Sequence, residues 1–384
     1  MSELRDVLDK HISNGPVPGA VALVARGDRV EVQEAGSVDI KGTAPMARDT
    51  IFRIASITKP VIAAAVMMLI EDGRIALDDP VAPWLPELAE PYVVRTPGSP
   101  VDDVVRAGRR ITVADLLSAH AGYGFPADFS LPAVAPLFSD LKQGAPQPQQ
   151  VAPPDAWMAE LSRIPLLHQP GEGWLYNTTS DIQGVLIARA SGRPLSEFLA
   201  ERIFEPLGMT DTGFHVPPAK LGRFTSFYRP ADDPAGGPVL VDAPDGQWSS
   251  PPAFPSGAGG LVSTVDDWLA FGRMLLAGGS VDGRRYLTPE SVRLMTTDHL
   301  TPAQRDAGKV FLEGQGWGFG GSVDIEPIDP WNVRGRYGWV GGTGTTAHIV
   351  PSTGTVAVLL SQLAMSSPTP PDLMRDFWRY AAGA

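Results

Sequence analysis

The 384-residue chain contains no cysteine. This absence excludes disulfide bonds, thiolate metal sites and a cysteine nucleophile. Histidine is also scarce: the six histidines are scattered, and none forms an H-x-H or H-x-x-x-H pair. No spacing therefore indicates a metal site, and we expect neither a metal nor a cofactor.

Long apolar runs are absent as well. The longest, at residues 61–70, falls far short of the roughly 20 residues that cross a bilayer. The first one, at residues 20–25, is too short for the core of a signal peptide. We therefore expect a cytoplasmic protein without a membrane span.

Basic residues are fewer than acidic residues in this chain. The chain has 31 basic and 43 acidic residues, a net charge of −12, and no run of lysines or arginines. This balance disfavours nucleic acids and anionic membranes as partners and leaves a small molecule as the expected one. Nothing in the sequence indicates an oligomeric state.

Strand patterns lie near both ends of the chain, with helices and loops between them. This order predicts an α/β (α+β) fold whose sheet is assembled from both termini and interrupted by a mostly helical lobe. We expect strands at residues 20–26, 29–35, 316–323, 335–340, 345–350 and 355–360, and helices at residues 3–14, 60–71, 156–163, 179–190, 195–204, 264–276 and 372–382, with a further helix starting at Thr112.

The predicted boundaries place residues 1–75 and 260–384 in an α/β domain and residues 76–259 in a mostly helical domain. Residues 125–155 and 228–258 are rich in proline or glycine and show little periodicity, so we expect irregular segments there. Small-molecule sites usually lie in clefts, and we expect the active site between the two domains, lined by these segments.

Ser56 and Lys59 stand three residues apart at the head of an apolar helix. Residues i and i+3 share a helix face, and Pro60 belongs to a first helical turn. The positive helix end favours a neutral amine and a developing oxyanion, which suits a serine nucleophile beside a base. A capping serine followed by a solvated lysine is the alternative interpretation of these residues alone.

The same spacing recurs at Ser139 and Lys142. Pro136 and Gly144 flank this copy, and no long apolar helix follows it. We interpret Ser139 as a surface residue, because the spacing by itself carries little information.

Two further segments offer groups that a Ser/Lys pair needs. Tyr176 precedes a helix and could relay a proton, although a tyrosine close to a tryptophan also suits core packing. The strand ending in Trp339 runs into glycines at 341, 342 and 344, where a backbone N–H could meet an oxyanion or a simple bulge could form. The G-x-S-x-G elbow of α/β-hydrolases is absent, but a Ser-His-Asp triad has no fixed spacing and stays open.

Several segments together resemble one known group, the serine β-lactamase and penicillin-binding-protein superfamily, and within it the family VIII carboxylesterases. They occur in the expected order from about residue 15 to the C-terminus, which is more specific than any single motif. They are IFRIASITKP at 51–60, LDDPV at 77–81, LLSAHAG at 116–122, IFEPLGM at 203–209, SGAGGL at 256–261 and GWGFG at 316–320.

This resemblance implies the β-lactamase-like fold with an antiparallel sheet. It implies that Ser56 is acylated, that Lys59 and Tyr176 transfer protons, and that the backbone N–H groups of Ser56 and Gly342 form the oxyanion hole. The resemblance further assigns substrate binding to Tyr123, Phe125, Thr178, Trp339, Val340 and Gly341.

Two departures from the superfamily pattern bear on the substrate. Thr178 stands in place of the asparagine of the Y-x-N element, where we expect it to hydrogen-bond Lys59. Trp339 and Val340 replace the basic and hydroxyl residues of the K-T-G box, which help to bind a carboxylate in lactamases and peptidases. Both changes favour an uncharged ester. A β-lactamase, D-peptidase, amide hydrolase, acyltransferase or non-catalytic binding module is the alternative.

Overall fold

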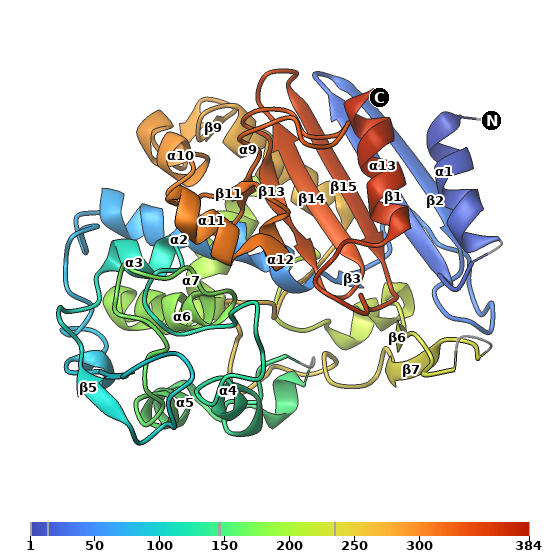
Figure 1. The fold of residues 1–384 in the computed structure, drawn as a ribbon. Helices are drawn as coiled ribbons and strands as arrows, with labels where there is room; N and C mark the ends of the chain where they lie inside the picture. Colours follow the sequence, from blue (N-terminus) through green and yellow to red (C-terminus); the bar gives the residue numbers. More distant parts are fainter. Residues whose placement is uncertain (1, 14, 145–146, 234–235, 384) are drawn as a thin grey trace.

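A seven-stranded antiparallel sheet forms one side of the molecule (Figure 1). The computed structural model describes residues 2–13, 15–144, 147–233 and 236–383. The strand order is β11-β12-β13-β14-β15-β1-β2, so strands from both ends of the chain meet where β15 pairs with β1. The sheet strands are β1 (Gly19–Arg26), β2 (Arg29–Gly36), β11 (Gly316–Trp317), β12 (Ser322–Val323), β13 (Tyr337–Gly341), β14 (Thr345–Val350) and β15 (Thr355–Ser361).

Helices cover both faces of this sheet, α13 (Asp372–Ala382) on one face and α9 (Val265–Leu276) on the other, and strands β1, β14 and β15 are buried almost throughout. In β1, Ala22 and Val24 belong to a cluster with Phe377 of α13, while Leu23 belongs to a second cluster with Trp268 of α9. Alternate strand residues thus face opposite layers. The layer with α13 (Asp372–Ala382) also contains α1 (Glu3–Ile12), and the opposite layer contains α9 (Val265–Leu276) and α2 (Lys59–Glu71).

The remaining elements lie beside and below the sheet in the view of Figure 1. They include helices α3 (Val113–Leu117), α4 (Ala135–Ser139), α5 (Pro154–Leu161), α6 (Thr178–Ser191), α7 (Leu195–Leu199), α8 (Glu205–Leu207), α10 (Pro289–Met295), α11 (Pro302–Ala307) and α12 (Lys309–Leu312), and a π-helical turn at Ala200–Phe204. Short two-stranded pairs join β3 (Phe52–Arg53) to β8 (Val262–Ser263), β4 (Tyr92–Val94) to β5 (Val104–Arg106), β6 (Phe227–Arg229) to β7 (Val239–Asp242), and β9 (Ser280–Val281) to β10 (Arg284–Arg285).

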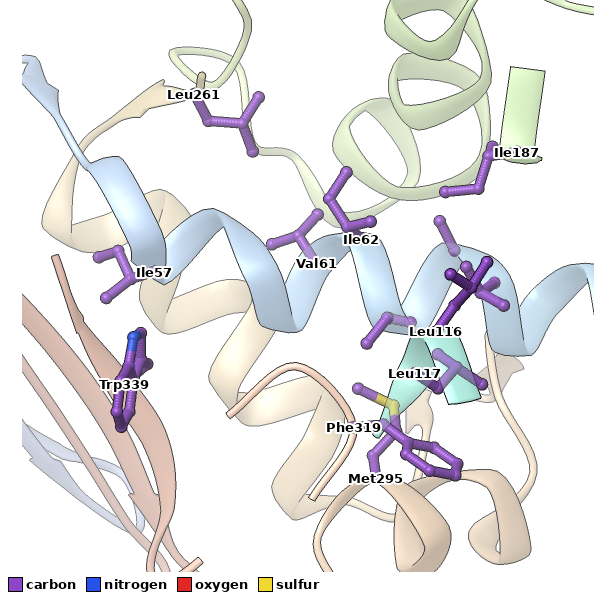
Figure 2. Close-up of a cluster of buried hydrophobic side chains, with 14 of the residues drawn as sticks. Ile57, Val61, Ile62, Leu116, Leu117, Ile187, Leu261, Met295, Phe319 and Trp339 are labelled. Carbon is purple, nitrogen blue, oxygen red and sulfur yellow. The ribbon is translucent and has the colours of Figure 1, made fainter. Parts of the chain in front are cut away.

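Helix α2 runs through the middle of the core. Eleven of its thirteen residues, from Lys59 to Leu69, are buried. Figure 2 shows side chains from α3, α6 and the loop at Phe319 gathered around it, with Trp339 beside the turn that carries Ile57. A helix that is apolar all round is expected at such a position. The first turn of α2 is therefore fixed by packing on all sides.

Most predicted elements are present within a few residues, and the helix expected to start at Thr112 is α3, which begins with a capping box of Thr112 and Asp115. The single strand predicted at residues 316–323 was wrong: β11 and β12 form a hairpin, and Gly318 N donates to Gly321 O at its turn, with Gly320 at φ +78°. The first helix ends at Ile12, and residue 14 of the prediction lies outside the described residues. No helix in the described part of the chain is long and apolar enough to cross a membrane.

Candidate active site

Ser56 lies on a strained turn at the head of α2. Ala55, just before it, has φ +45°, which is uncommon for a residue with a side chain. A 3₁₀ turn (Ala55–Thr58) leads directly into α2. The hydroxyls of Thr343 and Thr345 donate to the carbonyl oxygens of Arg53 and Ile54, at 2.6 and 2.8 Å. These bonds tie the turn to the end of β13 and the start of β14.

Lys59 Nζ has three polar neighbours. It lies 2.9 Å from Ser56 Oγ, 2.9 Å from Asn177 Oδ1 and 2.6 Å from the carbonyl oxygen of Ala258. Two of these neighbours accept only, whereas the serine hydroxyl can also donate. A neutral amine that donates to Asn177 and Ala258 therefore points its lone pair at Ser56.

Burial makes that neutral state accessible. Lys59 is 1% exposed. Desolvation lowers its pKa to about 7, and the nearby Asp181 carboxylate opposes the shift. The expected preference for a neutral amine thus has burial as its main cause.

Asn177 has an unusual backbone conformation that aims its amide at Lys59. Its φ and ψ are 81° and −66°, and Thr178 N donates to Tyr176 O at 3.2 Å. These values define a γ-turn of the rare positive-φ kind, which costs on the order of 1–3 kcal/mol. Strain of this size persists only where surrounding contacts over-determine the conformation.

The expected hydrogen bond from Thr178 to Lys59 was wrong. The γ-turn gives that position to the amide of Asn177, one residue earlier. Thr178 is fully buried, and its hydroxyl donates to Gln143 Oε1 at 2.7 Å. Gln143 Nε2 donates in turn to Asp181 Oδ2 at 2.9 Å.

Asp181 clamps the loop that presents the Ala258 carbonyl. Its Oδ1 accepts from Ser256 Oγ at 2.6 Å and from Ala258 N at 3.0 Å. The carboxyl is buried, and desolvation raises its pKa, while these donors and Lys59 oppose that change. Asp181 therefore positions an acceptor of Lys59 and adds a negative charge near it.

Tyr176 lies between Lys59 and Trp339. Lys59 Nζ is 4.7 Å from the centre of the phenol ring, and Trp339 Nε1 donates to Tyr176 Oη at 2.7 Å. Burial raises the pKa of Tyr176 to about 12, against hydrogen bonds with Ser56 and Trp339 that lower it. The phenol is consequently protonated at neutral pH, with its oxygen already facing one N–H donor.

A cavity of about 540 Å³ opens beside these groups and is lined mainly by apolar side chains. Ser56, Tyr176, Gly342 and the predicted Phe125, Trp339 and Val340 all line it. Three other predicted substrate-binding residues, Tyr123, Thr178 and Gly341, lie outside this lining. Tyr123 and Thr178 are buried in the core, and a Cβ added at Gly341 would clash with Thr345 Oγ1 and the carbonyl oxygen of Ile54.

The second Ser/Lys spacing has a different geometry. Ser139 is exposed at the end of the short helix α4, and its hydroxyl donates to Asp140 Oδ1 at 2.6 Å. Lys142 Nζ donates to the backbone oxygen of Ser139, at 2.7 Å, not to its hydroxyl. No amine is thus aimed at this hydroxyl.

The sequence interpretation missed Asn177, Asp181, Gln143 and Phe311. Asn177 had a signal, since an amide stands next to Tyr176, but a Y-x-N alignment counts it as the spacer. Asp181 lies in the first turn of α6, four residues after Asn177. Gln143 and Phe311 come from distant segments, and no spacing connects them to the site.

Comparison with known families shows the family to which this chain belongs. The Beta-lactamase family model matches residues 4–377. The chain belongs to the β-lactamase family. The predicted superfamily and fold are thereby confirmed.

Relatives of this β-lactamase-family chain include esterases. Protein Rv1367c of Mycobacterium tuberculosis is 38% identical over 100% of this chain and 92% of its own length. Lovastatin esterase of Penicillium rubens is 30% identical over 95% and 93% of the two chains, and esterase EstB of Burkholderia gladioli is 29% identical over 96% and 92%.

A solved structure agrees with this kinship. EstCE1, described as a hydrolase with promiscuous acyltransferase activity, superimposes with a TM-score of 0.78 at 25% identity, over 99% of this chain and 97% of its own. The chain therefore has both the sequence and the fold of a family that contains serine hydrolases.

Proposed function

We propose that this protein is a serine carboxylesterase that acts through an acyl-enzyme on Ser56. The observation that carries the proposal is the lone-pair geometry of Lys59, whose two fixed acceptors leave Ser56 Oγ at 2.9 Å as the remaining neighbour. Because the pKa of Lys59 is about 7, this side chain is neutral in a large share of the molecules at physiological pH. Lys59 is then the resting base, and Tyr176 the resting acid.

Acylation begins when Ser56 Oγ attacks the ester carbonyl and its proton passes to Lys59 Nζ. The oxyanion is stabilised by the backbone N–H groups of Ser56 and Gly342, which both line the cavity. Loss of one such donor typically costs about 100-fold or more in rate. Tyr176 then gives its phenolic proton to the leaving alkoxide as the C–O bond breaks.

Deacylation reverses these transfers with water in place of the alcohol. The Tyr176 phenolate, held by Trp339 N–H and the neighbouring Lys59 ammonium, takes a proton from the attacking water. As the acyl–oxygen bond to Ser56 breaks, Lys59 returns its proton to the serine. Both groups regain their starting states.

An uncharged ester fits this site better than a lactam or a peptide terminus. Trp339 carries no charge, and its one N–H donates to Tyr176, so it has no group left to bind a substrate carboxylate. Of the cations in the lining, Arg229 pairs with Asp232 and Lys142 donates to a backbone oxygen. A hydrogen bond to a charged group contributes about 1.5–3 kcal/mol. A substrate carboxylate without such a partner therefore loses roughly 10- to 150-fold in affinity.

Comparison of p-nitrophenyl butyrate with nitrocefin tests this proposal. We expect a higher kcat/KM for the ester, and loss of both activities in Ser56→Ala. Faster turnover of the lactam would contradict the esterase assignment.

Acyl transfer to a second alcohol is the alternative that a specific comparison favours, since EstCE1 is a hydrolase described with such an activity. An alcohol in place of water would lose its proton to the same phenolate. Adding methanol to the assay and measuring the ratio of methyl ester to free acid separates the two outcomes.

A further inference from the structure

Five aromatic rings form a continuous wall along the cavity. We define the aromatic wall as Phe138, Phe125, Phe129, Phe311 and Tyr176. Phe125 stacks on Phe138 at 4.8 Å between ring centres and lies 5.8 Å from Phe129. Phe129 lies 6.0 Å from Phe311, which lies 4.8 Å from Tyr176. The wall thus begins in α4 and ends at the phenol.

Backbone contacts hold the wall in place. Phe125 and Tyr176 exchange two backbone hydrogen bonds, of 2.8 and 3.0 Å. Gly144, at φ +105°, sits under the Phe138 ring, where an added Cβ would lie 2.8 Å from Cε1. The rings therefore occupy defined positions relative to Tyr176.

Two rings of the wall are left partly uncovered. Phe129 is 42% exposed and Phe138 is 36% exposed, although both line the cavity. Phe125, between them, is 6% exposed. Aromatic faces of this kind gain from contact with a large apolar or aromatic ligand group, which a methyl or ethyl group is too small to provide.

The position of Tyr176 at one end of the aromatic wall indicates which part of the substrate would lie against the rings. Tyr176 ends the wall and, under the proposed function on which this inference rests, protonates the leaving alcohol. The rings therefore border the side of the ester bond from which the alcohol departs. We propose that the substrate is an ester of a bulky, uncharged alcohol with aromatic rings, which lie along the aromatic wall.

A matched series of butyrate esters tests this assignment. Ethanol, cyclohexylmethanol and 2-(1-naphthyl)ethanol are all primary alcohols, so the intrinsic reactivity of their esters is similar. We expect kcat/KM to rise along the series, by about tenfold from the ethyl to the naphthylethyl ester. Ethyl 4-(1-naphthyl)butanoate, which carries the ring on the acyl side, should gain less.

Variants of the exposed rings supply the second readout. Phe129→Ala and Phe138→Ala should lower the naphthylethyl-to-ethyl ratio by about three- to tenfold. Ile328→Ala, which removes an even more exposed apolar side chain (53%) outside the cavity lining, should leave the ratio unchanged.

Three results would overturn the inference: equal kcat/KM across the alcohol series, a larger gain from the ring on the acyl side, or an unchanged ratio in both phenylalanine variants. These outcomes all require ester hydrolysis. If no ester in the set is cleaved and Ser56 stays unmodified, the proposed function itself fails, so the two failures are distinguishable.

Discussion

The acid–base properties of the site depend on the burial of single side chains and on their hydrogen-bond partners. Burial favours the neutral forms of both Lys59 and Tyr176, because desolvation disfavours the charged form of either group. One environment thus moves the pKa of the lysine down and that of the tyrosine up. This produces a base and an acid that coexist at neutral pH.

The pH dependence of kcat/KM follows from this pair. Lys59 must be neutral in the free enzyme, so activity should fall as pH drops through about 7 and decline about tenfold per unit well below it. Tyr176 keeps its proton up to about pH 12, so no alkaline loss is expected below pH 9. A profile between pH 5 and 9 with an uncharged ester measures this, and a flat profile down to pH 5 would exclude Lys59 as the base.

The hydrogen bond from Trp339 to Tyr176 can be tested by a single change. Trp339→Phe keeps an aromatic ring but removes the N–H that stabilises a developing phenolate, and kcat should fall about 10- to 150-fold. Trp317→Phe is the matched control, because Trp317 Nε1 is buried and has no hydrogen-bond partner among the described residues. Equal losses in the two variants would mean that ring packing alone matters.

Among the structural elements, the segment from Tyr176 to Asp181 contributes most to the site. Its γ-turn points Asn177 at Lys59, and the first turn of α6 then brings Asp181 to the Ala258 loop. This one segment thus positions both acceptors of the Lys59 amine, Asn177 Oδ1 and the Ala258 carbonyl oxygen. The strained turn persists because the contacts of Asn177 and Asp181 on its two sides over-determine the conformation.

Two substitutions at Asn177 separate strain from function. Asn177→Ala and Asn177→Gly both remove the amide, so both should lose kcat to a similar extent, about tenfold. Glycine tolerates the positive φ and alanine does not, so the glycine variant should be more stable by roughly 1 kcal/mol in the free energy of unfolding. Urea titrations and steady-state kinetics measure both effects. Equal stabilities would argue against strain at this turn, and an unchanged kcat against the role of the amide.

Regular elements were the part of the fold that the sequence could predict. Helix α13 and strands β14 and β15 match the expected residues within one position, because their periodic apolar residues face packed layers. The position of Asn177 was missed because a strained turn contradicts local preference. The aromatic wall was missed because its rings come from residues 125–138, Tyr176 and Phe311, which only tertiary packing brings together.

At the scale of the whole molecule, the sheet joins the two ends of the chain, and α13 seals one of its faces. Phe377 of α13 is fully buried there with Trp378 and residues of β1 and β15. The division into residues 1–75 with 260–384 and residues 76–259 stays a prediction.

Phe377→Ala tests whether this distant layer supports the fold without tuning the site. The cavity left behind should lower the free energy of unfolding by about 3–5 kcal/mol. The midpoint of the acid limb in the kcat/KM profile should stay near pH 7, because Lys59 keeps its surroundings. A shifted midpoint would show that α13 is coupled to the active site.

The central claim is that Ser56 forms the covalent intermediate. Intact-mass analysis after incubation with a fluorophosphonate tests it most directly, on the native chain, Ser56→Ala and Ser139→Ala. We expect one adduct on the native chain and on Ser139→Ala, and none on Ser56→Ala. An undiminished adduct on Ser56→Ala, or no adduct on the native chain, would contradict the claim.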